Sequence, residues 1–236
     1  MTTFVLVHGA WHGGWCYARV REKLQAMGHT VFTPTMTGLC DRSHLLSPSV
    51  GLQTHILDVA NLLAWENLSE VVLCGHSYGG MVITGAADRE ADRLKALVYL
   101  DAFVPSHGQA AFDLRAPERN AIALKKAREK GAGWLLPPTR AATFKVNAAD
   151  QAWVDAKCTD IPLACFTQPL HLTGAYKGIA RKVYLRAAGC EAPGFDRVLA
   201  ECAADPKWIT DSVDCGHDVM VDDPDWLVER LIEAGE

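Results

Sequence analysis

The stretch Val71-Val72-Leu73-Cys74-Gly75-His76-Ser77-Tyr78-Gly79-Gly80-Met81-Val82-Ile83 decides the fold prediction. An apolar run of strand type leads into a Gly-x-Ser-x-Gly pattern, after which residues 78–88 indicate a helix. Between a strand and a helix, this pattern predicts a turn so tight that the serine backbone is strained and its hydroxyl is exposed. The glycines two positions before and after Ser77 keep the neighbouring backbone from clashing. The stretch therefore predicts that Ser77 is a covalent nucleophile.

The bulk composition is typical of a single α/β domain of moderate size. The chain has 236 residues, of which 49% are hydrophobic, which is enough for a large core. A net charge of −5 without long runs of either sign argues against nucleic acid or an anionic membrane surface as a partner. No apolar stretch reaches membrane-spanning length, and Met1-Thr2-Thr3-Phe4 lacks the basic region of a signal peptide. We therefore expect a cytoplasmic protein that acts on a small molecule, while no feature predicts an oligomeric state.

Cysteine and histidine spacing predicts neither disulfides nor a metal site. The eight cysteines include no Cys-x-x-Cys pair and no zinc-like cluster, so we expect reduced thiols. His8 and His12 have no carboxylate or third histidine at a supporting spacing, so no metal is expected. The chemistry predicted for Ser77 needs no cofactor.

Strand and helix patterns alternate through most of the chain. The predicted strands are residues 4–8, 30–33, 71–76, 96–100, 182–187 and 208–211. The predicted helices are residues 15–27, 52–63, 78–88, 194–203 and 225–233. Apolar strands that alternate with helices predict a mostly parallel sheet with helices on both faces, an α/β fold.

The alternation stops after Pro105. Residues 106–180 are mostly Ala-rich and helix-like, with breaks at Pro137-Pro138 and Pro162 and no clear strand. We expect a core of residues 1–104 and 181–236, with a helical lid of residues 105–180 inserted between two strands. The residues expected to contact an apolar, partly aromatic substrate are Trp11, Phe103, Trp134 and Phe166.

A serine hydroxyl is a poor nucleophile unless a neighbouring base takes its proton. In chains with this serine turn, the base is a histidine near the C-terminus, after the last strand. Cys215-Gly216-His217-Asp218 lies at that place, so His217 is the predicted base.

The reaction also needs two backbone N–H groups that stabilise the developing oxyanion. One is expected from Tyr78, the residue after the nucleophile. The other is expected from the loop after the first strand, His8-Gly9-Ala10-Trp11-His12-Gly13-Gly14-Trp15. We assign the second donor to Ala10, with Trp11 as the alternative.

These three motifs, together with Pro34-Thr35-Met36-Thr37-Gly38 and Tyr99-Leu100-Asp101-Ala102-Phe103-Val104-Pro105, resemble one branch of the α/β-hydrolase superfamily. That branch includes plant methylesterases, plant hydroxynitrile lyases and small bacterial esterases. The resemblance is strong at both ends of the chain and weak across the insertion. It implies an α/β-hydrolase fold and hydrolysis of a small carboxylic ester, or a related amide or carbamate, through an acyl-enzyme on Ser77.

The catalytic acid departs from the pattern of this branch. The acid usually follows the strand after the lid, where counting places Cys190, and a neutral thiol cannot orient the histidine. Asp101 ends the strand after the serine helix and keeps the order serine, acid, histidine, so we favour it. Glu191, adjacent to Cys190, is the alternative.

Two other functions stay open at this point. A hydroxynitrile lyase of this branch needs a threonine and a lysine where this chain has Gly9 and Asp218, and an anionic Asp218 is expected to repel cyanide. The departure at Cys190 also leaves room for a ligand-binding receptor that has lost its chemistry.

Overall fold

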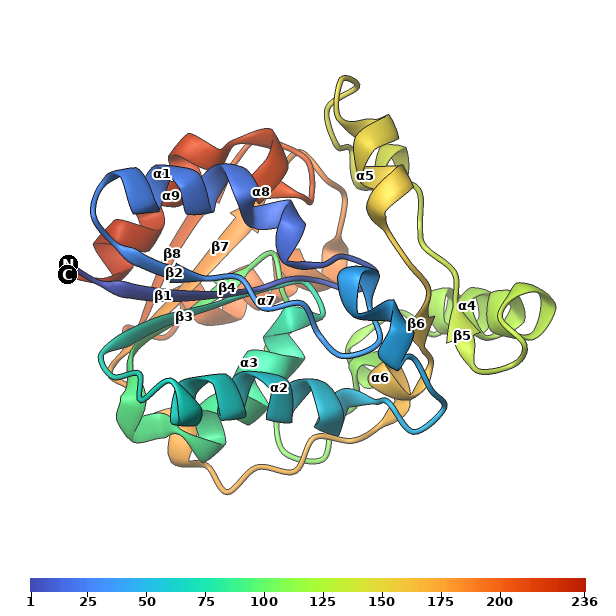
Figure 1. Cartoon of the computed structure of the whole chain (residues 1–236), viewed down its shortest axis with the longest axis horizontal. Helices are drawn as coiled ribbons and strands as arrows, with labels where there is room; N and C mark the ends of the chain where they lie inside the picture. Colours follow the sequence, from blue (N-terminus) through green and yellow to red (C-terminus); the bar gives the residue numbers. More distant parts are fainter.

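The computed structural model describes all 236 residues and contains a six-stranded sheet (Figure 1). Its strands are β1 (Thr3–Val7), β2 (Thr30–Phe32), β3 (Val71–His76), β4 (Leu94–Leu100), β7 (Arg181–Ala187) and β8 (Trp208–Val213). They lie in the order β2-β1-β3-β4-β7-β8, and every pair is parallel. All carboxyl ends therefore meet at one edge of the sheet, as predicted for a mostly parallel α/β fold.

Helices cover both faces of this sheet (Figure 1). One face packs against α2 (Leu52–Trp65), α3 (Gly79–Arg89) and α7 (Pro193–Ala203). The other face packs against α1 (Ala18–Ala26), α8 (Val219–Asp222) and α9 (Pro224–Ala234). Because side chains alternate along a strand, Val71 and Leu73 enter the first core while Val72 and Cys74 enter the second. Because both faces of β3 are buried, its sequence is a nearly continuous apolar run.

Most predicted strands and helices are within two residues of the observed ones. The 71–76 strand has the predicted bounds, whereas β4 begins at Leu94 instead of residue 96, and β8 continues to Val213. These ends carry half-buried or polar side chains such as Lys95 and Ser212, so the apolar pattern fades before the backbone pairing stops.

The insertion between β4 and β7 lies beyond the carboxyl edge of the sheet (Figure 1). Its helices are α4 (Pro117–Lys130), α5 (Gln151–Lys157) and α6 (Ala164–Thr167). It also contains an antiparallel pair, β5 (Leu135–Leu136) and β6 (Ile161–Pro162), so the expectation of no strand in this segment was wrong. Two-residue strands are too short to give an alternating pattern. The division into core and lid at residues 105 and 180 stays a prediction.

The chain returns from the insertion alongside α3. The Asp88 carboxylate near the end of α3 accepts hydrogen bonds from the backbone N–H groups of Thr173, Gly174 and Tyr176. These bonds lower the pKa of Asp88, although burial acts in the opposite sense.

No helix of the protein is both long and apolar enough to cross a membrane.

Close packing between α3 and the loop after β4 predicts a stability effect at Gly80. A Cβ atom at Gly80 would lie 2.1 Å from the Phe103 carbonyl oxygen, so Gly80→Ala must displace backbone. We expect the free energy of unfolding, measured in urea, to fall by about 2 kcal/mol or more. The matched control is Gly178→Ala, since nothing lies within 4 Å of a Cβ there. Equal stability of the two variants would contradict this packing.

Candidate active site

Ser77 occupies a strained turn between β3 and α3. Its φ angle is +54°, in the left-handed region that non-glycine residues rarely adopt. The turn is held on both sides, because Ser77 N–H donates to the Leu100 carbonyl at 3.1 Å and the Ser77 carbonyl accepts from Phe103 N–H at 3.2 Å. A Cβ at Gly75 would lie 2.6 Å from the Gly79 carbonyl oxygen, so the first glycine of the motif is required for the tight turn.

His217 lies in the loop after β8 and contacts Asp101 at the end of β4. Its Nδ1 is 2.5 Å from Asp101 Oδ2, and Asp101 is wholly buried. The phenyl rings of Phe144 and Phe195 flank the imidazole, with centroid distances of 5.1 and 5.9 Å. Because the carboxylate engages Nδ1, the other ring nitrogen is the one left to exchange a proton. His217 and Ser77 border the same cavity.

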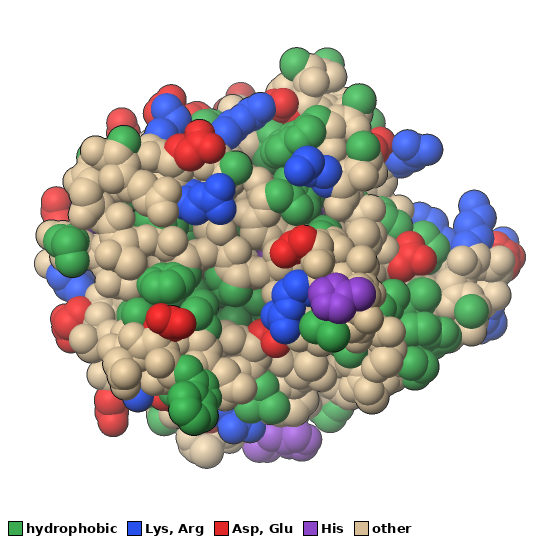
Figure 2. Space-filling view, in the orientation of Figure 1, with side chains coloured by type: hydrophobic (Ala, Val, Ile, Leu, Met, Phe, Trp, Pro, Cys, Tyr) green, Lys and Arg blue, Asp and Glu red, His purple; other side chains and the backbone are tan.

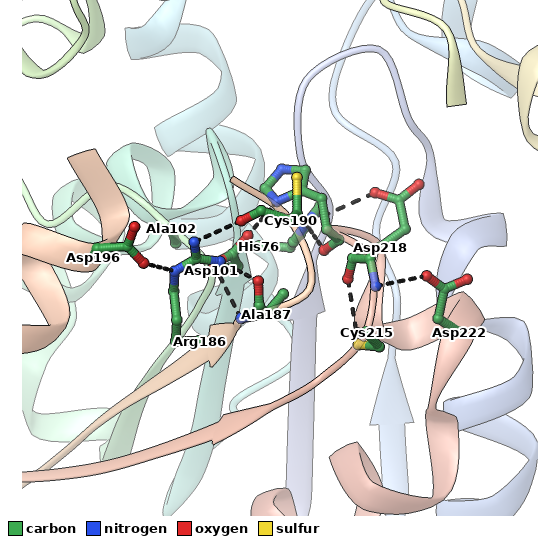
Figure 3. A network of polar contacts seen from close by, with 12 residues as sticks. His76, Asp101, Ala102, Arg186, Ala187, Cys190, Asp196, Cys215, Asp218 and Asp222 are labelled. Atoms are coloured by element: carbon green, nitrogen blue, oxygen red, sulfur yellow. Dashed lines mark hydrogen bonds and ion pairs between the residues drawn. The ribbon is translucent and has the colours of Figure 1, made fainter. Parts of the chain in front are cut away.

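The second oxygen of Asp101 contacts a buried arginine that the sequence analysis missed. Asp101 Oδ1 accepts from Arg186 Nη1 at 2.9 Å and from Ala187 N–H at 3.2 Å. Arg186 Nε donates to Asp196 at 2.8 Å, so the guanidinium lies between two carboxylates (Figure 3). Burial alone would lower the pKa of Arg186, but Asp101 and Asp196 raise it overall. Arg186 therefore supplies the positive charge that a buried Asp101 carboxylate needs.

Neither Cys190 nor Glu191 reaches His217 through a polar contact. Both border the cavity, but the Glu191 side chain is exposed and makes no hydrogen bond or ion pair. Burial, together with the charge of Asp101, raises the pKa of the Cys190 thiol, which keeps it neutral. Between the two predicted acids, the geometry favours Asp101. The signal in the sequence was the arginine at the end of an apolar strand, which implies a buried carboxylate partner.

Several residues that line the cavity have a backbone N–H group with no hydrogen bond inside the chain, and Ala10, Trp11 and Tyr78 are among them. Ala10 and Tyr78 are the predicted oxyanion donors, and Trp11 is the predicted alternative. Trp11 has a φ angle of +67°, and its indole Nε1 donates to the Leu136 carbonyl at 3.0 Å. This bond ties the first loop to the insertion.

A second buried polar network lies behind His217. His12 Nε2 is 3.0 Å from Asp218 Oδ2, and His12 Nδ1 is 2.8 Å from the Ala10 carbonyl oxygen. His76 Nε2 is 3.0 Å from the His217 carbonyl oxygen. The network thus connects the loop of Ala10 with the loop of His217.

In this network, His12 and Asp218 stabilise each other in their charged forms. Burial alone would lower the pKa of His12, but the Asp218 carboxylate raises it well above its usual value. Burial alone would raise the pKa of Asp218, but His12 lowers it overall. Asp218 does not border the cavity, and its carboxylate is paired with His12.

His8 belongs to the scaffold of the site. Its Nε2 accepts a hydrogen bond from Met36 N–H at 3.0 Å, and burial lowers its pKa to about 3. His8 and His12 therefore have separate partners within the fold, and neither forms part of a cluster that could hold a metal ion.

The cavity at Ser77 has a volume of about 550 Å³, and both hydrophobic and polar side chains line it. Three of the four predicted substrate residues line it, namely Trp11, Phe103 and Phe166. Trp134 is half-buried in the insertion and is not part of the lining. Lining residues that we did not predict include Phe144, Phe195, Arg115, Arg119 and Lys126.

Comparison with known proteins gives the class to which this arrangement belongs. The alpha/beta hydrolase family matches residues 4–230. The chain is 44% identical over 243 residues to a carbendazim hydrolyzing esterase of Nocardioides sp. (strain SG-4G), with 100% of both chains covered. It is 34% identical over 113 residues to methylesterase 2 of Arabidopsis thaliana, and this match covers 43% of this chain and 40% of that protein.

Among solved structures, an extracellular alpha/beta-hydrolase from a Paenibacillus species superposes with a TM-score of 0.86. The two chains are 22% identical, and each is covered over 100% of its length, which shows a shared fold. The protein belongs to the alpha/beta hydrolase family. It is a hydrolase of the esterase type, and the predicted family is confirmed.

The contact between His217 and Asp101 predicts different effects when each of the two candidate acids is replaced by its amide. Asp101→Asn removes the anion that orients His217, so we expect kcat for an activated ester to fall by roughly 10⁴. Glu191→Gln removes an equal charge from the cavity rim and should stay within about tenfold of wild type. An inactive Glu191→Gln beside an active Asp101→Asn would reverse the assignment.

The His12–Asp218 pair predicts a pH dependence of stability. Since the folded pKa of His12 is raised, its contribution is complete below the unfolded value of 6.5 and is lost as pH rises through the folded pKa. In the Asp218→Asn variant, the anion is gone and burial lowers the pKa of His12 below 6.5. The stability of this variant therefore rises as the pH approaches 6.5 from below. The difference in unfolding free energy between wild type and Asp218→Asn should therefore shrink from pH 5 to pH 9. A constant or growing difference in urea denaturation would contradict the ion pair.

Proposed function

We propose that the protein is a serine esterase whose acyl-enzyme forms on Ser77. The observation that carries the proposal is the 2.5 Å contact between His217 Nδ1 and Asp101 Oδ2 beside a serine in a strained turn. That contact holds the proton on Nδ1, so the other ring nitrogen acts as the base toward Ser77. Residues 1–104 and 181–236 act as the catalytic core in this scheme, and residues 105–180 as the lid.

The reaction follows from these roles. As Ser77 Oγ attacks the ester carbonyl, its proton passes to His217, and the Ala10 and Tyr78 N–H groups stabilise the oxyanion. His217 then donates the proton to the leaving alkoxide, which departs as the alcohol. A water molecule attacks the acyl-enzyme with His217 again as base and releases the acid. Both half-reactions use only groups of the chain and water.

The proposed substrates are small aromatic esters and carbamates. Aromatic side chains form much of the cavity wall, and Trp11 packs between Phe144 and Phe166 at centroid distances of 6.1 Å to each. A flat ring can stack on such walls. The likeness to a carbendazim hydrolyzing esterase extends over the full length of both chains. This likeness supports a carbamate ester as a substrate beside carboxylic esters.

We also propose that the enzyme works in the cytoplasm, because all eight cysteines are free thiols. Neither alternative function gains support from the site. The position after His217 holds Asp218, turned away from the cavity, where a hydroxynitrile lyase of this branch needs a lysine. A receptor without chemistry has no use for the strained Ser77 backbone.

Covalent labelling tests the proposal directly. A fluorophosphonate should label wild type at Ser77, and Ser77→Ala should lose labelling together with roughly 10⁶-fold of kcat. Ser106→Ala, which changes an exposed serine outside the cavity, is the matched control and should label like wild type. Hydrolysis of p-nitrophenyl butyrate and carbendazim gives the activity readout. Labelling at another residue, or full activity of Ser77→Ala, would refute the proposal.

A further inference from the structure

The cavity wall opposite the sheet is positively charged, against the trend of the whole protein. The chain carries a net charge of −5, yet the cavity is lined by Arg115, Arg119 and Lys126 and by one carboxylate, that of Glu191. All three cations come from α4 or the residues just before it. Figure 2 shows basic side chains on the lobe that Figure 1 labels α4. Such a wall favours an anion inside the cavity.

Arg115 is half-buried and, unlike the buried Arg186, has no acidic partner. Arg186 contacts two carboxylates, whereas the Arg115 guanidinium makes no ion pair and no hydrogen bond within the chain. It lies instead over the rings of Phe112 and Phe166, 5.3 and 5.4 Å from their centroids. Ring contacts hold the guanidinium in place but leave its N–H donors free.

The unpaired charge is costly in this place. Burial, with repulsion from Arg119, lowers the pKa of Arg115 to about 10, so the group is still charged at neutral pH. A partly buried cation without a counter-ion is destabilised, and a ligand carboxylate would recover that loss. Arg offers the planar fork of donors that binds a carboxylate through two hydrogen bonds.

Arg115 and Ser77 line the same cavity, together with the ring of Phe166 that the Arg115 guanidinium contacts. A substrate whose ester group is held at Ser77 therefore shares this cavity with the free N–H donors of Arg115.

We propose that Arg115, assisted by Arg119, is a binding subsite for a carboxylate on the substrate. The preferred substrates are then esters that carry a negative charge at the end opposite the scissile bond, such as the monoesters of an aromatic dicarboxylic acid. This inference rests on the proposed function of Ser77 and adds a substrate class to it. After hydrolysis such a substrate leaves as a dianion.

Two esters that differ only in charge test the subsite. They are the mono-4-nitrophenyl ester of terephthalic acid and the 4-nitrophenyl ester of 4-carbamoylbenzoic acid. We expect wild type to prefer the anionic ester by at least about tenfold in kcat/KM, mainly through KM, as a charge-assisted hydrogen bond predicts. Arg115→Gln should reduce the ratio of the two kcat/KM values about 10- to 100-fold. Lys125→Gln, on the same helix but outside the cavity and paired with Glu129, should leave the ratio unchanged.

A binding measurement separates failure of the subsite from failure of the proposed chemistry. The Ser77→Ala variant is titrated in a calorimeter with 4-carbamoylbenzoate and with neutral terephthalamide. Tighter binding of the anion, lost in the Ser77→Ala, Arg115→Gln double variant, supports the subsite even if neither ester is hydrolysed. Equal binding of the two compounds, or no preference in turnover of the neutral and anionic esters, would overturn the subsite and leave the role of Ser77 standing.

Discussion

The hydrogen bond between His217 and Asp101 is the contact on which the proposed chemistry depends. It lies in the protein interior, where an ionised carboxylate is stable only with a compensating charge and further hydrogen bonds. Arg186 and the Ala187 N–H group provide both on the far oxygen of Asp101. The near oxygen is therefore free to hold His217 in one orientation. Asp196 in turn balances Arg186, so both charges of the Asp101–Arg186 pair are compensated.

The fold brings these groups together because all six strands are parallel. The loops after β1, β3, β4 and β8 end at the same edge of the sheet, and they carry Ala10, Ser77, Asp101 and His217. Hydrogen bonds between neighbouring loops fix their spacing, as between Ser77 and Leu100. The His12–Asp218 pair adds a contact between the first and last loops. A rigid edge of this kind allows a strained serine turn to persist.

The sequence predicted what local pattern determines and missed what long-range contact determines. Ser77 and His217 follow from short motifs beside strands, and Asp101 follows from chain order. Arg186 was missed because its role depends on a carboxylate 85 positions away. In the insertion, no sequence periodicity indicates which aromatic side chains face the cavity. The prediction that Phe166 lines the cavity was correct, whereas Trp134 does not line it. Arg115 gives no motif, since its relevant property is the absence of a partner.

The most direct test of this account is the crystal structure of the protein after reaction with a fluorophosphonate. The account predicts a phosphorus atom bonded to Ser77 Oγ, with the phosphoryl oxygen roughly 2.7–3.1 Å from the Ala10 and Tyr78 nitrogens. It also predicts that the His217–Asp101 contact is retained. A phosphoryl oxygen directed away from both N–H groups, or His217 turned from Asp101 toward Glu191, would contradict the account.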